Sequence, residues 1–137
     1  MKPVDIVAVS HIGIRVLDAA RSETFYAKLG FELVWRGGAE PVVILKNAHS
    51  VEINLIVNAD SSLDGKNMLM DDDLPKAAGY THVALAVESI EDTIVRLREH
   101  GIELSGGPVK LGQGVSLFVR DPDRNVIELR AMTPHAS

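Results

Sequence analysis

The chain has 137 residues, of which 46% are hydrophobic and 24% charged, so its length suits one domain or two small modules sharing a core. The formal net charge of -5 argues against nucleic acid as a partner. No apolar run approaches the ~20 residues that a membrane span needs, so no membrane partner is expected. The absence of cysteine excludes disulfides, thiolate zinc sites and a cysteine nucleophile. The N-terminus lacks the apolar core of a secretory signal, which predicts a cytoplasmic protein.

The first half of the chain predicts the order strand, helix, strand, strand, strand. A first strand ends near Leu17, and Asp18 is a candidate N-cap for a helix over residues 19–29. Gly30 is a natural stop for that helix. Three further strands are predicted at residues 31–36, 41–46 and 50–57.

The second half predicts the same order. A strand over residues 80–87 precedes Ser89, which caps a helix over residues 90–100, and Gly101 ends that helix. Further strands are predicted near residues 102–104 with a possible extension to 110, and at residues 115–120 and 126–131. The repetition predicts an α+β fold of two β-α-β-β-β modules in a single domain. The modules span residues 8–57 and 80–131, joined by a linker over residues 58–79.

A histidine recurs at the start of both modules, on the polar face of a strand. In residues 10–16 apolar residues alternate with a face that carries His11 and Arg15, with a glycine between them. Residues 81–87 repeat this alternation, and His82 lies on the face opposite the apolar residues. Two echoing strands that each carry a histidine among small residues are not typical of an ordinary core.

Each module also ends on a strand that carries a glutamate opposite an apolar stripe. Glu52 shares its face with Asn54, and Glu128 shares its face with Arg130. A single glutamate in such a strand usually faces solvent. Here two glutamates lie on corresponding strands of two modules, and each module also carries a histidine. This pattern instead favours a common site.

The four residues His11, Glu52, His82 and Glu128 are the predicted ligands of one divalent metal ion. Two carboxylates balance the charge of a divalent cation, which lowers the cost of burying the group. Two nitrogen and two oxygen ligands favour nickel, cobalt, zinc, manganese or ferrous iron. They leave positions open for water or substrate, as in a catalytic rather than a structural site.

With these residues, the duplicated module resembles the vicinal oxygen chelate superfamily, and the ligand order is similar to that of the glyoxalase I family. Other matching pieces are residues 25–31, 107–110 and 121–129, and the resemblance covers roughly residues 8–131. It implies two βαβββ modules that form curved mixed sheets around a metal-binding cleft. It also implies a homodimer in which His11 and Glu52 of one chain meet His82 and Glu128 of the other.

The function that this resemblance implies is that of a metal-dependent lyase. Such an enzyme isomerises the hemithioacetal of a 2-oxoaldehyde and glutathione, or another thiol, to a 2-hydroxyacyl thioester. Glu128 is then the expected base that moves the substrate proton, with Glu52 as its catalytic counterpart. Arg15 and Lys110 match positions near the thiol co-substrate, and Asn54 is a third candidate for substrate binding.

Two departures from the glyoxalase I pattern concern the first module and the last turn. The asparagine expected four residues after Glu52 is replaced by Ile56, and the glycine of the last turn is replaced by Arg124. Asn125 is expected to take the left-handed conformation in that turn.

Two other classes of function remain open for this sequence. An extradiol-type dioxygenase or an epimerase on the same frame is one, and in such a dioxygenase two histidines and one glutamate suffice, so that Glu52 is surplus. The other is a drug- or metabolite-binding protein, which needs none of the four ligands.

Overall fold

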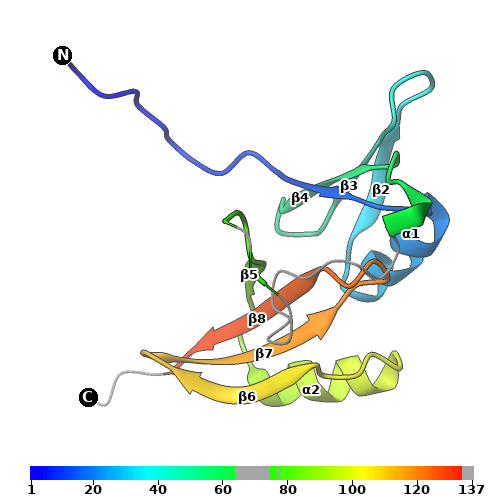
Figure 1. The fold of residues 1–137 in the computed structure, drawn as a ribbon. Helices are drawn as coiled ribbons and strands as arrows, with labels where there is room; N and C mark the ends of the chain where they lie inside the picture. The colour runs from blue at the N-terminus through cyan, green and yellow to red at the C-terminus, as the bar shows by residue number, and fades with distance from the viewer. Residues whose placement is uncertain (64–74, 77, 134–137) are drawn as a thin grey trace. The chain divides into compact units, whose positions relative to one another are not determined.

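The computed structural model describes residues 1–63, 75–76 and 78–133, and it confirms the order β-α-β-β-β in each half of the chain (Figure 1). The chain divides into two compact units, residues 1–61 and 62–137. The division falls inside the predicted linker, of which residues 64–74 and 77 lie outside the described residues. Within the described residues, no helix combines the length and the apolar character needed to cross a membrane.

The first unit is a four-stranded mixed sheet with one helix. The strand order is β1-β4-β3-β2, in which β1 runs parallel to β4 and the other pairs are antiparallel. The elements are β1 Ile12–Arg15, α1 Ala19–Lys28, β2 Glu32–Arg36, β3 Val42–Lys46 and β4 Glu52–Ile56.

The second unit repeats this topology with the strand order β5-β8-β7-β6, in which β5 runs parallel to β8. A short 3-10 helix, η1, spans Ser61–Leu63 at the division between the units. The elements of the second unit are β5 Val83–Ala86, α2 Ile90–Glu99, β6 Gly106–Leu111, β7 Gly114–Arg120 and β8 Val126–Met132.

The prediction of a strand near residues 102–104 is wrong, because the strand that follows α2, β6, begins only at Gly106. The N–H of Ile102 donates to the carbonyl of Leu97 and so closes the end of α2. Pairing with β7 begins only where the N–H of Ser105 donates to the carbonyl of Phe118, and β6 follows from Gly106.

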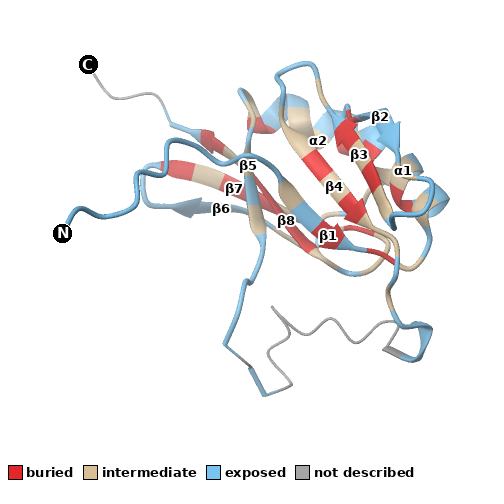
Figure 2. Ribbon diagram, turned by 90° about the horizontal axis from the view of Figure 1, so that it is seen from above, coloured by how far each residue is buried: buried red, intermediate tan, exposed pale blue. Residues whose placement is uncertain are grey.

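The central strands of each sheet bury an apolar face, as the alternation in the sequence predicts, while the edge strands β2 and β6 are largely exposed. In β4, Ile53 and Leu55 are fully buried while their neighbours are half-buried (Figure 2). Tyr26 of α1 is also fully buried, and in β8 Ile127 is fully buried and Leu129 nearly so. The other face of each sheet is therefore left to carry the polar side chains of the candidate site.

The two helices begin at the predicted caps. The side chain of Asp18 accepts a hydrogen bond from the N–H of Arg21 at 3.0 Å, and Ser89 accepts one from the N–H of Asp92 at 3.1 Å. Each cap satisfies one of the N–H groups that a helix leaves unpaired at its start.

The tight turn before the last strand is the same in both units, and this similarity sets the register of β4 and β8. One side-chain oxygen of Asn47, or of Asp121, accepts hydrogen bonds from the N–H groups two and four residues further on. Ser50 and Arg124 then take matching left-handed conformations, with φ of 63° and 67°. The prediction that Asn125 takes this conformation is therefore wrong, because the side-chain bonds of Asp121 hold the turn around Arg124.

We expect the Ile53→Ala variant to destabilise the protein by about 2–5 kcal/mol and Ile53→Val by about 0.5–1.5 kcal/mol, because the side chain is fully buried. Urea unfolding followed by circular dichroism measures both values. Val95→Ala, at a half-exposed position on α2, is the control and should change the free energy of unfolding by less than about 0.5 kcal/mol. Equal losses at both positions would contradict the assignment of Ile53 to the core.

Candidate metal-binding site

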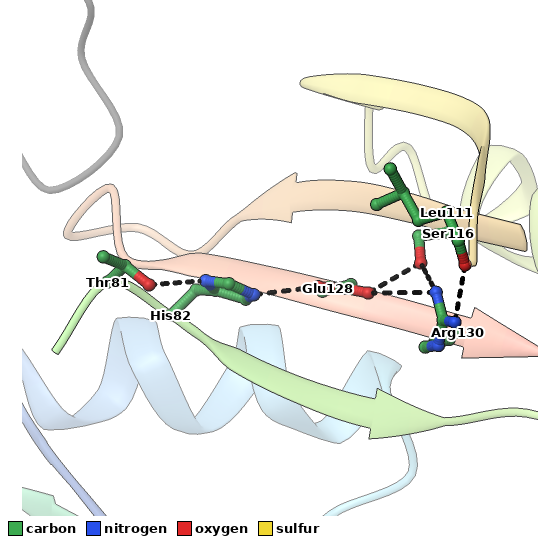
Figure 3. A network of polar contacts seen from close by, with 6 residues as sticks. All are labelled: Thr81, His82, Leu111, Ser116, Glu128 and Arg130. Atoms are coloured by element: carbon green, nitrogen blue, oxygen red, sulfur yellow. Dashed lines mark hydrogen bonds and ion pairs between the residues drawn. The ribbon is translucent and has the colours of Figure 1, made fainter. Parts of the chain in front are cut away.

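In the second unit, the predicted ligands His82 and Glu128 are in direct contact. His82 precedes β5 and Glu128 lies in β8, its parallel neighbour. Nε2 of His82 donates to Oε1 of Glu128 at 2.8 Å, and Nδ1 of the same ring is 2.8 Å from Oγ1 of Thr81 (Figure 3). The Glu128 side chain is only 10% exposed, so this contact is shielded from water on most sides.

The second oxygen of Glu128 is held by groups of the same sheet. The hydroxyl of Ser116 in β7 donates to Oε2 at 2.6 Å. The guanidinium of Arg130 donates to Oγ of Ser116 at 3.1 Å and to the carbonyl of Leu111 at 2.6 Å (Figure 3). A buried carboxylate with both oxygens engaged has little freedom to turn.

These contacts lower the pKa of Glu128 below its ordinary value. The hydrogen bond from Ser116 is the largest cause, and burial opposes it by disfavouring the charged form. The hydrogen bond and charge of His82 and the charge of Arg130 lower the pKa further. Glu128 is therefore an ionised acceptor at neutral pH, which suits a metal ligand better than it suits a general base.

In the first unit, the predicted ligands His11 and Glu52 also lie near each other, with a different geometry. Oε2 of Glu52 is 3.8 Å from Nδ1 of His11, and Oε1 is 3.6 Å from Nζ of Lys46. The hydroxyl of Ser10 is 3.0 Å from the same Nδ1 atom. The His11 side chain is 44% exposed, so this pair is far more open to solvent than the pair in the second unit.

The two histidines share one feature that the sequence analysis missed. Each is preceded by a hydroxyl residue, Ser10 or Thr81, whose oxygen lies within hydrogen-bond distance of Nδ1. A histidine that binds a metal through one nitrogen usually donates from the other. In both units Nε2 would therefore be the nitrogen that faces a metal ion, and in the second unit this is the nitrogen that contacts Oε1 of Glu128.

The register of the strands pairs Glu128 with Asn54 rather than with Glu52. In parallel pairing, Gly13 lies opposite Asn54 and Ala84 lies opposite Glu128. Gly13 and Ala84 each follow the histidine of their module by two residues, so Asn54 and Glu128 occupy matching positions. The same alignment holds across β3 and β7 and in the turns before β4 and β8. The two glutamates thus do not occupy matching positions, as the sequence analysis had assumed.

Asn54 is suited to the fourth metal-ligand position. Its Oδ1 atom is buried and has no hydrogen-bond partner among the described residues. An amide oxygen left without a donor is costly unless a ligand or water satisfies it. A Cβ at the neighbouring Gly13 would contact nothing within 4 Å, so there is open space beside Asn54.

The donors present on the two sheets are of kinds that fit a divalent cation. Two imidazole nitrogens, a carboxylate oxygen and an amide oxygen are ligands that first-row transition metals accept. The chain places them in two groups, one in each unit, and among the described residues no three His, Asp or Glu side chains form a metal-binding group. A single ion shared by both groups stays a prediction.

Two of the predicted substrate-binding residues, Arg15 and Lys110, lie in different units of the structure. Arg15 is the last residue of β1, the strand that begins directly after His11, and its Nε donates to Oδ1 of Asn58 at 3.0 Å. Lys110 pairs with Val115 in β6 and β7, one residue out of phase with Ser116. Alternation along the strand therefore puts Lys110 on the sheet face opposite Glu128.

Ser116 is the polar residue near Glu128 that the sequence analysis missed. It is fully buried in β7, between apolar neighbours. Its alternation with Phe118, which pairs with Glu128, was visible in the sequence, but the pairing of β7 with β8 was not. Only the register shows that Ser116 and Glu128 share a face.

The sequence model of the Glyoxalase/Bleomycin resistance protein/Dioxygenase superfamily matches residues 8–129. The chain belongs to this superfamily, as the resemblance predicted. Members of the superfamily are built on the duplicated frame seen here, and the family assignment by itself leaves the reaction open.

Three relatives show how far sequence similarity reaches. The glyoxalase domain-containing protein RDO1 of Mycosarcoma maydis is 30% identical over 132 residues, which are 93% of this chain and 70% of that protein. Protein YwkD of Bacillus subtilis is 29% identical over 127 residues, 89% of this chain and 94% of YwkD. The lactoylglutathione lyase of Salmonella typhimurium is 40% identical over only 52 residues, 36% of this chain and 38% of the lyase.

Solved structures support the fold. A glyoxylase/bleomycin resistance protein/dioxygenase domain from Frankia sp. EAN1pec superposes with a TM-score of 0.73 at 24% identity, over 94% of this chain and all of that domain. The fosfomycin resistance protein FosX of Listeria monocytogenes superposes with a TM-score of 0.69 at 20% identity, over 94% of both chains. At these identities the likeness concerns the fold alone.

The lowered pKa of Glu128 predicts a pH dependence of stability in the metal-free protein. The carboxylate stabilises the fold above the ordinary glutamate pKa of ~4.3, and this stabilisation is lost as the pH falls through the lower folded-state pKa. The reason is that the unfolded chain takes up its proton first. We therefore expect the wild-type protein to lose stability relative to Glu128→Gln over that interval.

Urea unfolding of both proteins at a series of pH values above and below the ordinary glutamate pKa measures this difference. Glu103→Gln, at an exposed position of the same unit, controls for the loss of one charge. A constant difference between wild type and Glu128→Gln across the whole series would contradict the prediction.

Proposed function

We propose that the protein is an enzyme that binds a divalent metal ion through His11, His82 and Glu128, with Asn54 at the fourth ligand position. The observation that carries the proposal is the matched register, in which Asn54 and Glu128 each pair with the residue two positions after the histidine of their unit. Two histidines and one carboxylate leave positions where a small substrate can bind through two neighbouring oxygens. The small-molecule partner expected from the sequence is kept in this proposal.

Each residue of the proposed site has a defined task. Nε2 of His11 and of His82 and Oε1 of Glu128 donate to the ion, while the hydroxyls of Ser10 and Thr81 orient the rings. Glu52 lies on the Nδ1 side of His11, so we assign it to orienting that ring rather than to the ion. The bound ion supplies Lewis acidity toward the oxygens of the substrate.

The donor set predicts how single substitutions change the affinity for a metal ion. His11→Ala, His82→Ala and Glu128→Gln should each weaken binding strongly, because each removes a donor atom. Asn54→Asp should strengthen binding, because it adds a negative charge at the fourth position. Glu52→Gln should lower the affinity by less than about tenfold, the lower end of the effect of residues that orient a ligand.

Isothermal titration of the metal-free protein with Ni²⁺, Co²⁺, Zn²⁺ and Mn²⁺ measures these affinities and the stoichiometry. Glu40→Gln, at an exposed position of the first unit, is the control for Glu52→Gln. If Glu52→Gln abolishes binding while Asn54→Ala does not, Glu52 rather than Asn54 is the fourth ligand, as the sequence first suggested.

The donor set favours the two-histidine, one-carboxylate chemistry of an extradiol-type dioxygenase or an epimerase. With Asn54 at the fourth position, only one carboxylate faces the ion, and its lowered pKa makes it a weak base. Ferrous iron with this donor set is typical of enzymes that activate oxygen. A substrate with two adjacent hydroxyl groups, such as a catechol, has the required pair of oxygens.

The metal-dependent lyase expected from the sequence is the second candidate. It is favoured by the 52 residues that are 40% identical to lactoylglutathione lyase. In this reaction a carboxylate must carry a proton between neighbouring carbons, and Glu52 or Glu128 would do so while Arg15 binds the carboxylate of the thiol. Lys110 is less suited to contact the thiol, because it lies on the sheet face opposite Glu128.

Two assays on the same metal-loaded preparations separate these candidates. Oxygen uptake with catechols that requires ferrous iron, without turnover of methylglyoxal and glutathione, is the expected result for the dioxygenase. Formation of the thioester with nickel, cobalt or zinc would instead establish the lyase. If the folded protein binds no metal ion and turns over neither catechols nor methylglyoxal with glutathione, the proposal is overturned. A non-catalytic binding protein would then be the remaining function.

The homodimer expected from the resemblance stays a prediction. In that arrangement, His11 and Asn54 of one chain would meet His82 and Glu128 of the other. The assays above use the full chain at a concentration where any dimer is intact, so they do not depend on which chains share a site.

A further inference from the structure

We propose that Ser116 and Arg130 form a positioning pair that holds one oxygen of Glu128 and leaves the other as a single donor. This inference rests on the proposed function, because the donor acts on the metal ion proposed there. It assigns a role to two residues that do not themselves reach the ion, and it concerns the second unit alone.

The two oxygens of Glu128 have different partners. Oε2 accepts a hydrogen bond from the hydroxyl of Ser116, while Oε1 faces Nε2 of His82 (Figure 3). A metal ion that replaces the proton between His82 and Glu128 would meet Oε1. Because Oε2 is occupied, Glu128 is restrained to binding through one oxygen rather than through both.

Arg130 acts on Glu128 through Ser116. Its NH1 atom is 3.9 Å from Oε2 of Glu128, too far for a hydrogen bond, but it donates to Oγ of Ser116 at 3.1 Å. Because Oγ of Ser116 accepts a hydrogen bond from Arg130, its own hydroxyl proton is directed toward Oε2 of Glu128. The positive charge of Arg130 also offsets the cost of burying the carboxylate.

The guanidinium of Arg130 is itself held in place by other groups of the second unit. Its NH2 atom donates to the carbonyl of Leu111, the last residue of β6. A Cβ at Gly114 would come within 2.8 Å of the guanidinium carbon, so a glycine is required there for Arg130 to lie where it does. The arginine is thus fixed from two sides rather than extended into solvent.

The first unit, which has the same topology, serves as an internal control. Ser116 and Arg130 pair with each other across β7 and β8, and the matching pair across β3 and β4 is Val42 and Ile56. Both residues of that pair are apolar. The polar pair therefore occurs in the unit that carries the charged Glu128, and it is replaced in the unit that carries the neutral Asn54.

The experiment measures the affinity of the metal-free 137-residue chain for Ni²⁺ alone by isothermal titration. We expect Ser116→Ala and Arg130→Met each to weaken binding about 10- to 100-fold, the usual effect of losing a residue that orients a ligand. Arg130→Lys should recover part of the affinity, because it keeps the charge but loses the planar fork that reaches two acceptors. The double variant should be no weaker than the weaker single variant, because both residues act through Oε2.

A spectroscopic readout shows whether the coordination itself changes. Ser116→Ala loaded with Co²⁺ should show an altered visible absorption spectrum, because Glu128 is then free to bind through both oxygens. Arg120→Met is the matched control, since Arg120 lies in β7 and its guanidinium donates to the carbonyl of Arg124 at 2.9 Å. It should keep both the affinity and the spectrum of the wild-type protein.

The possible results separate this inference from the proposed function. If the wild-type protein binds Ni²⁺ and Glu128→Gln does not, but Ser116→Ala matches the wild type in affinity and spectrum, the positioning pair is rejected and the metal site stands. If the wild-type protein itself binds no metal ion, both proposals fail. Circular dichroism and thermal unfolding confirm that each variant is folded, so that a loss of affinity reflects the site.

Discussion

The candidate site depends on one carboxylate that is held at both oxygens. Glu128 lies in a buried strand, between an imidazole on one side and a serine hydroxyl on the other. A charge in such a place is stable only if it is fully hydrogen-bonded and balanced, and His82, Ser116 and Arg130 provide for both. The same contacts that make the charge tolerable also fix its direction, so the stability and the chemistry of this strand are linked.

The duplicated frame makes the differences between its halves informative. The two units have the same topology, the same turn before the last strand and a histidine at the same place. They differ in the side chains on the last strand and its antiparallel neighbour. The first unit has the amide of Asn54 with apolar residues beside it, and the second has the carboxylate of Glu128 with Ser116 and Arg130 beside it. A duplicated module thus carries two unequal halves of the proposed site, with most of the charge in the second.

Much of the fold could be predicted because it is encoded locally. Period-two alternation identified most of the strands, and the caps Asp18 and Ser89 located the helix starts. The failure at residues 102–104 arose because a short apolar segment after a helix can close that helix as readily as begin a strand. The histidines and Glu128 also stood out, because each interrupts an apolar pattern in a way that local structure alone does not require.

The sequence by itself determined the repeated β-α-β-β-β order, the apolar faces and the residue types able to bind a metal. It could not determine which residue of β4 corresponds to Glu128, because a glutamate and an asparagine lie on the same face only two positions apart. That choice depends on the register between strands distant in the sequence, which the matching turns at Asn47 and Asp121 fix. Only the tertiary structure therefore revealed Asn54 as the counterpart of Glu128 and Ser116 as its partner, since hydrogen bonds across a sheet depend on pairing rather than on local pattern.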